Sequence, residues 1–190
     1  MYFCYWGGIL AQRREYANTA PNATKLVLTR HYAEAKRVNT DVLAWEAHLL
    51  PAVSTGVWLV NATAPPLPAS SAIATLNAVA YDQGPSGNFV VGQFVIPGSG
   101  DKTLVMIVNQ DPNFNVLANF TFHDSAQKMH VCEVERAHGT EVAVLFEGQE
   151  GFADGSVGGG GAAPALQLFV GAGDARLLAL GDKPCAHHYN

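Results

Sequence analysis

The apolar residues of the second half of the chain fall into short runs separated by turns. Two runs rich in β-branched and aromatic residues, 89–96 and 103–108, flank the segment 97–101, which reads PGSGD. A short Gly/Pro/Asp connection between such runs predicts a β-hairpin. Both runs are apolar at successive positions, which is typical of strands buried on both faces. We expect this hairpin to form the centre of the domain.

Further strand-like runs follow the same pattern on either side of the hairpin. They cover residues 73–81, 116–122, 129–135, 141–146, 166–170 and 176–180, with Gly-, Pro-, Asn- or Asp-containing turns between several of them. Short strands with a turn every 8–12 residues indicate an antiparallel sandwich or barrel. The predicted fold is therefore mainly β, an antiparallel β-sandwich of about eight strands.

The pattern before residue 64 is different. An aromatic run, 1–8 (MYFCYWGG), predicts a buried strand that begins abruptly, so we expect the chain to start inside a domain. Residues 9–21 resemble a connection. From about residue 25 to 50, apolar residues recur every three or four positions, which predicts an amphipathic helix that ends near Pro51. A short strand is expected at 56–60.

Proline content suggests where the domains divide. Residues 64–71 contain Pro65, Pro66 and Pro68 and read as a linker. We therefore expect a first segment, 1–63, with a strand, a helix and a short strand, and a β-sandwich over 72–190. The first segment is too small for a core of its own, whereas 72–190 is expected to fold alone.

Composition narrows the classes of partner. Hydrophobic residues make up 48% of the 190 residues, and the formal net charge is −5. A negative chain argues against a nucleic-acid or anionic-membrane partner. No apolar run approaches the roughly 20 residues of a membrane-spanning helix.

Cysteines and glycosylation sequons bear on localisation. Cys4, Cys132 and Cys185 are far apart and lack metal-site spacing, so buried or free thiols are one interpretation. A Cys132–Cys185 disulfide is the alternative if the protein is secreted. Asn-x-Thr sequons at Asn22, Asn61 and Asn119 favour a secreted or lumenal location, which the rest of the sequence leaves open.

Three segments give the chain a resemblance to a known family. They are the strand 2–8, the segment 31–58 (HYAEAKRVNTDVLAWEAHLLPAVSTGVW), and the β-region with FVVGQF at 89–94, LVMIVNQD at 104–111 and LFVGAGDARLLAL at 168–180. Their order resembles the C-terminal end of retaining glycoside hydrolases in which a TIM barrel precedes a β-sandwich. The first two segments resemble the last barrel strand and helix.

The closing segment matches the family's turn motif at four positions and departs from it at two. Its members typically have a Pro-Gly-Asp-Gly-Arg-Leu turn between the last two strands; Gly173, Asp174, Arg176 and Leu177 match. Ala172 replaces the proline, and Ala175 replaces the second glycine.

The resemblance implies that catalysis belongs to a part of the barrel outside these 190 residues. Retaining members use two carboxylates, about 5–5.5 Å apart, on earlier barrel strands. We expect this chain to lack them and to carry no catalytic residue, cofactor or metal. The missing barrel is an expected partner, and carbohydrate is another. Trp6 would lie at the C-terminal end of a barrel strand, where it would stack on a sugar; a buried strand Trp is the alternative.

Other candidate residues have simpler interpretations. Asp174 suits a turn better than a site with Arg176, and Glu133 and Glu135 suit a solvated strand face. His123, His130, His138, His187 and His188 lack a metal-binding spacing.

Three hypotheses remain. The first is a non-catalytic end of a glycoside-hydrolase-like protein, in which the sandwich supports the barrel. The second is a free-standing carbohydrate-binding or adhesion module, although the β-region contains no Trp. The third is a complete enzyme with an unrecognised site.

Overall fold

The structure is a computed structural model of the 190-residue chain, and it describes residues 11–15, 24–28, 30–80, 87–100, 102–123, 130–144 and 166–185. Residue contacts divide the chain into two compact units, Met1–Ala44 and Trp45–Asn190. Each unit is described by itself below. The predicted strand at 1–8, with Cys4 and Trp6, lies outside the described residues.

The first unit contains a hairpin and most of a helix. Strands β1 (Ala11–Glu15) and β2 (Thr24–Leu28) pair antiparallel, with Ala11 opposite Leu28. Helix α2 (Arg30–Leu49) continues into the second unit and ends just before Pro51. The helix therefore starts later than its periodicity predicted, because residues 24–28 pair with β1. No helix among the described residues is long and apolar enough to cross a membrane.

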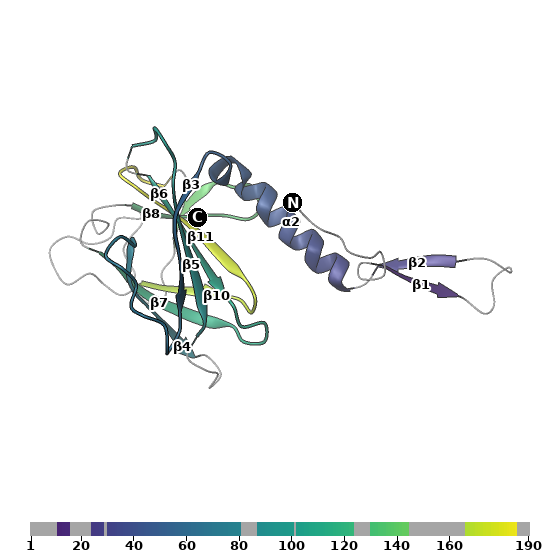
Figure 1. Ribbon diagram of the computed structural model, residues 1–190. Helices are drawn as coiled ribbons and strands as arrows, with labels where there is room; N and C mark the ends of the chain where they lie inside the picture. The colour runs from purple at the N-terminus through teal and green to yellow at the C-terminus, as the bar shows by residue number, and fades with distance from the viewer. Residues whose placement is uncertain are drawn as a thin grey trace. The chain divides into compact units, whose positions relative to one another are not determined.

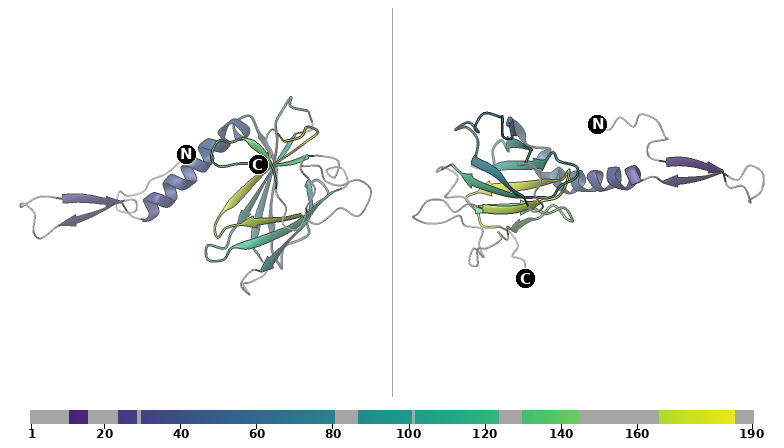
Figure 2. Two further views of the ribbon diagram at one scale, coloured as in Figure 1. Left: turned by 180° about the vertical axis from the view of Figure 1, so that it is seen from behind. Right: turned by 90° about the horizontal axis from the view of Figure 1, so that it is seen from below.

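The second unit is an antiparallel β-sandwich, which confirms the predicted fold class (Figure 1). A three-stranded sheet has the order β10-β7-β4, and a six-stranded sheet has the order β3-β5-β6-β11-β8-β9. The strands are β3 (Val53–Val60), β4 (Ile73–Ala80), β5 (Phe89–Val95), β6 (Thr103–Asn109), β7 (Val116–Phe122), β8 (His130–Val134), β9 (Glu141–Ala143), β10 (Leu166–Val170) and β11 (Ala175–Gly181). Figure 2 shows the same strands from behind and from below.

The core lies between these two sheets. On β7 the alternate residues Val116, Ala118, Phe120 and Phe122 belong to it, as the two-residue period of a strand requires. The facing six-stranded sheet contributes residues such as Val105, Ile107 and Leu178, all fully buried. Phe120 and Phe122 meet edge to face, with ring centroids 5.5 Å apart. This core is the main source of stability.

The central hairpin is confirmed. β5 and β6 pair from Phe89 opposite Asn109 to Val95 opposite Thr103, and both are interior strands of the larger sheet. In the turn between them, Gly98 and Gly100 have φ angles of +79° and +74°. Glycine is the residue that adopts such angles without steric cost, so these two positions explain the turn sequence.

The linker predicted at 64–71 follows a strand that belongs to the sandwich. β3 pairs with β5 along its length, and Trp58 and Val60 pack against the core. Leu67, within the linker, packs there too. A β-bulge interrupts the register between Ser54 and Gly56. A Cβ at Gly56 would lie 2.2 Å from the Trp58 ring, so the bulge requires glycine for close packing. The strand before the linker thus belongs to the same compact unit, Trp45–Asn190, as the strands after it.

Asn109 fixes the loops at the end of β6. Its side chain is fully buried, and its Nδ2 donates to the carbonyls of Phe114 (2.8 Å) and Gly171 (3.0 Å). Its Oδ1 accepts from the backbone N–H of Asp111 at 3.0 Å. All three contacts satisfy a polar group that would otherwise be costly to bury. The Asn of the LVMIVNQD motif therefore has a structural role.

The last turn of α2 is held to the sandwich by Trp45. Its side chain is only 5% exposed, and its indole N–H donates to the carbonyl of Val134 at 2.9 Å. The guanidinium of Arg136 lies 5.8 Å from the Trp45 ring centroid, a cation–π contact. One turn later, His48 contacts the carbonyl of Gly139. Helix and sandwich thus meet through a buried aromatic anchor inside the second unit.

Candidate functional site

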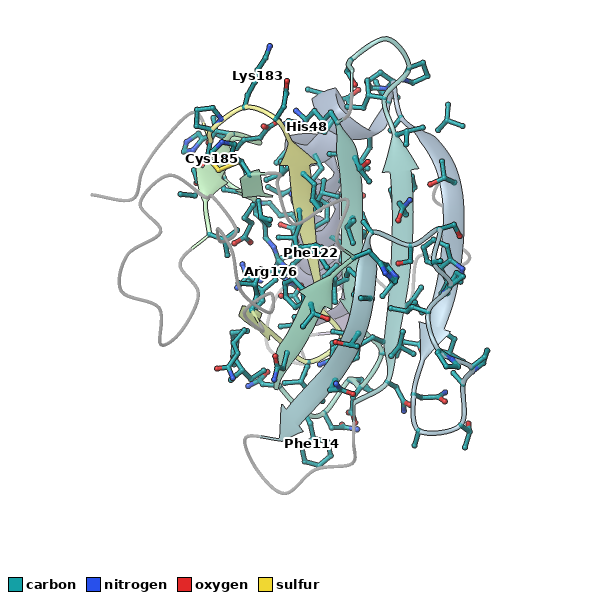
Figure 3. The ribbon with its side chains drawn as sticks, turned by 90° about the vertical axis from the view of Figure 1, so that its left-hand side faces the viewer. His48, Phe114, Phe122, Arg176, Lys183 and Cys185 are labelled. Carbon is teal, nitrogen blue, oxygen red and sulfur yellow. A yellow bond between two sulfur atoms is a disulfide. The ribbon has the colours of Figure 1, made fainter. Side chains whose placement is uncertain are left out.

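A hollow lies on the six-stranded sheet where β6 begins and β11 ends. Its volume is about 420 Å³, within the size range of small-molecule sites. In Figure 3, His48, Lys183 and Cys185 lie at this end of the sandwich and Phe114 at the opposite end. The described lining residues are Gly98, Ser99, Lys102, Cys132, Glu141, Ala179, Leu180, Gly181, Asp182 and Lys183.

Glu141, in the lining of the hollow, contacts Lys102, which also lines it, and His48, which is not among the described lining residues. Its Oε1 pairs with Lys102 Nζ and lies 3.4 Å from His48 Nδ1. His48 Nε2 lies 2.8 Å from the Gly139 carbonyl oxygen, which can only accept, so Nε2 carries a proton. The three side chains come from the helix end, the start of β6 and β9. Glu141 is thus already engaged by two cationic or potentially cationic groups.

The lining of the hollow contains paired charges, as in an ion-pair cluster, and lacks the aromatic ring that is typical of a sugar site. Glu141 and Asp182 are the two carboxylates in the lining, beside Lys102 and Lys183. None of the described lining residues is aromatic, so they offer no ring on which a sugar would stack. The hollow is therefore a better candidate for binding a small polar group than for holding a sugar ring.

A disulfide closes one side of the hollow. Cys132 on β8 and Cys185, just after β11, are bonded, with their Cα atoms 5.6 Å apart. The structure thus decides between free thiols and a disulfide for this pair. Cys185 is 6% exposed and Cys132 3%, so the bond is buried against the sheet. It fixes the segment after the last strand of the fold.

Replacing both bonded cysteines with serine should destabilise the protein. The disulfide spans 53 residues, and the loop-closure model gives about 4 kcal/mol for a loop of that length. Urea unfolding of the double variant Cys132→Ser/Cys185→Ser should show a midpoint lowered accordingly. The wild-type chain in reducing agent is the matched control and should shift by a similar amount. Unchanged midpoints in both would contradict a stabilising bridge.

Two further ion pairs change the interpretation of residues singled out in the sequence. Glu133 is opposite the core residue Leu178, so it faces the inside of the sandwich and does not lie on a solvated strand face. Its Oε1 accepts from Arg176 Nη1 at 2.5 Å. Arg176 also donates from Nε to the carbonyl of Phe169 on β10, which links the two sheets. Arg176 thus bridges the layers.

Asp174 belongs to the turn between β10 and β11. Its N–H donates to the Gly171 carbonyl, and its carboxylate pairs with Arg136 at 2.9 Å. Gly173 in the same turn has a φ of +61°, which favours glycine. Arg136 is the residue that contacts Trp45, so this closing turn and the helix anchor share one guanidinium. The acidic residue predicted for the turn is therefore also part of a packing network.

Trp6 is the residue predicted to touch substrate, and no metal site is predicted for the histidines. Trp6, Asn22, His187 and His188 lie outside the described residues. His138 pairs with Glu135 at 2.8 Å and is mostly exposed. Within the described ranges, no group of three or more His, Cys, Asp or Glu side chains could hold a metal ion.

Sequence reasoning missed the cluster around Glu141. His48, Lys102 and Glu141 are separated by dozens of residues and belong to three different elements. No spacing along the chain links them, because Lys102 and Glu141 meet only in the folded sheet, where β11 and β8 lie between β6 and β9. Comparison with known proteins gives no further guide: no family model, no curated protein and no solved structure matches this chain.

Proposed function

We propose that this sandwich is a non-catalytic C-terminal domain that supports the barrel of a glycoside-hydrolase-like protein. The observation that carries the proposal is the apolar stripe of α2. Its C-terminal end is buried at Trp45, whereas Tyr32, Val38 and Val42 in the same stripe are 38%, 40% and 45% exposed. An apolar helix face of this length normally packs on another element. A barrel strand is the partner that the resemblance implies.

The anchor explains how such support would act. Trp45 fixes the last turn of the helix to β8, and Arg136 joins that turn to the loop that carries Asp174. The helix is bound to the sandwich at one end. An element that packs on its other end would therefore be stabilised by the sandwich through the helix. The side chains that do this are structural, and the carboxylates Glu133 and Asp174 are occupied by arginines.

The transcript upstream of the codon for Met1 tests the proposal. We expect an open reading frame that encodes alternating strands and helices with two catalytic carboxylates. In the extended protein, Val42→Asp should lower the unfolding free energy by several kcal/mol, because the side chain would be buried. In the 190-residue chain the same change should be nearly neutral. An in-frame stop codon directly upstream, or equal effects of Val42→Asp in both chains, would overturn the proposal.

A carbohydrate-binding module is the second candidate, and one face of the three-stranded sheet favours it. Asn77, Asn119 and Gln167 are directly opposite one another across β4, β7 and β10. Since their neighbours Ala118 and Phe120 face the core, this row of amides faces outward. Phe169, 41% exposed, lies on the same face. The amides of Asn77 and Gln167 and the Phe169 ring are groups that bind sugar hydroxyls and sugar faces, whereas the Oδ1 of Asn119 between them is buried.

Affinity electrophoresis in gels containing soluble polysaccharides separates the two candidates. A binding module would be retarded, and Phe169→Ala would restore free migration. Phe114→Ala is the matched control, because Phe114 is equally exposed but lies in the loop before β7. Retardation abolished by Phe169→Ala alone would favour the binding module over the support domain.

A further inference from the structure

Two of the three sequons, Asn61 and Asn119, lie in the described residues, and they occupy unlike positions in the fold. Asn22 lies outside the described residues. Asn119 is in the middle of β7, the central strand of its sheet, with Asn77 and Gln167 directly opposite on either side. Its Oδ1 is buried, and the hydroxyl of Thr121 is hydrogen-bonded to that of Thr75 at 2.7 Å. A glycan attached to Asn119 would have to project from a closely packed row of side chains.

Asn61 stands instead in a turn directly after β3. Its side-chain Oδ1 accepts from the N–H of Thr63 (2.9 Å), the hydroxyl of Thr63 (3.0 Å) and the N–H of Ala64 (2.7 Å). Three donors on one atom fix which end of the amide is the oxygen. The amide nitrogen, Nδ2, is therefore turned away from the backbone, and it has no hydrogen-bond partner among the described residues. Ala62 and Thr63 are exposed.

We propose that Asn61 is an N-glycosylation site and that Asn119 is not used in the folded protein. The sequon supplies the Asn and the Thr hydroxyl that this modification requires, on a surface turn. The Cys132–Cys185 disulfide is an independent observation, since stable disulfides form in the oxidising compartments through which glycoproteins pass. The proposal does not depend on the barrel-support function.

The reaction is a transfer of an oligosaccharide from a polyprenyl-diphosphate carrier, catalysed by a host transferase. The Asn61 Nδ2 attacks the anomeric carbon of the first sugar, and a C–N bond forms. The bond between that carbon and the phosphate oxygen breaks, and polyprenyl diphosphate leaves with the electron pair. Nδ2 loses one proton to a base of the transferase. The Oδ1 bonds of the turn survive, because the oxygen does not react.

A glycan at Asn61 also limits where a partner can lie. Asn61 follows the edge strand β3, whose outer residues Val57 and Leu59 are exposed. A bulky sugar at the end of this strand would keep the 61–63 turn in solvent. Any domain that packs on β3 would therefore have to stop short of that turn.

The test is secretion of the full chain from a eukaryotic host behind the host's own leader. Peptide:N-glycosidase treatment in heavy-oxygen water converts each glycosylated Asn to a labelled Asp, which mass spectrometry of both secreted and retained protein assigns to a residue. We expect label at Asn61 and none at Asn119 in the secreted protein. Thr63→Ala should remove the Asn61 label and its gel shift, whereas Thr121→Ala should leave both unchanged.

A second variant separates loss of the glycan from loss of the turn. Asn61→Asp keeps an oxygen acceptor for Thr63 and Ala64 but cannot be glycosylated, so it should fold and be secreted without the Asn61 gel shift. Label at Asn119 in secreted protein would overturn the proposal. So would an unlabelled Asn61 in both the secreted and the retained wild-type protein.

Discussion

Val105→Asp is expected to abolish folding. Val105 lies on β6, an interior strand of the six-stranded sheet, and its side chain is fully buried in the core. A carboxylate there would lose its water and gain no partner, at a cost of several kcal/mol. Total stabilities of domains of this size are about 5–15 kcal/mol. Ile107→Asp, two residues along the same strand face, should have the same effect.

Val57→Asp is the matched control. It makes the same substitution in the same sheet, but Val57 is 64% exposed on the edge strand β3. Circular dichroism melts should show cooperative unfolding for this variant within a few degrees of the wild type and none for the two core variants. If Val105→Asp melts like the wild type, β6 is not the centre of the core.

Removal of residues 45–71 should destabilise the sandwich strongly. This segment holds Trp45 and the strand β3, which pairs with β5 over seven residue pairs. Without it, β5 becomes an unprotected edge, and the core loses the packing of Trp58, Val60 and Leu67. We expect a chain of residues 72–190 to be less stable than one of residues 45–190 by at least about 3 kcal/mol.

Urea unfolding and size-exclusion chromatography of these two shortened chains decide the matter. The composition of 64–71 predicts a boundary there, whereas the contacts of the fold begin the sandwich at Trp45. A 72–190 chain that aggregates or unfolds at lower urea would support the earlier start. Equal midpoints and monomeric elution for both chains would support the linker as the boundary.

The strands of the sandwich were predictable because their pattern is local. β7 and β10 have the bounds expected from sequence, 116–122 and 166–170, and the β5–β6 hairpin follows from its apolar runs and glycine turn. These elements are specified by alternation and turn residues, which act over a few positions. The sandwich class follows from the number and spacing of such strands.

Features that depend on distant partners were not predictable in the same way. Residues 24–28 fit the helical spacing, but pairing with 11–15 makes them a strand. The sequence predicts a solvated Glu133 because a single strand does not reveal which of its faces the second sheet covers. The His48–Lys102–Glu141 cluster depends on the order β11-β8-β9, which no local pattern specifies. Contacts between side chains that depend on the order of the strands are therefore seen only in the structure and not in the local sequence.

The proposal that this sandwich supports a barrel and hydrolyses no glycoside itself can be tested by measuring turnover. The purified chain should be assayed with a panel of aryl glycosides against buffer alone, together with the variants Glu141→Gln and Asp182→Asn, which alter the carboxylates of the hollow. We expect release of the aryl alcohol at the buffer rate for all three proteins. Turnover above buffer that disappears in either variant would contradict it.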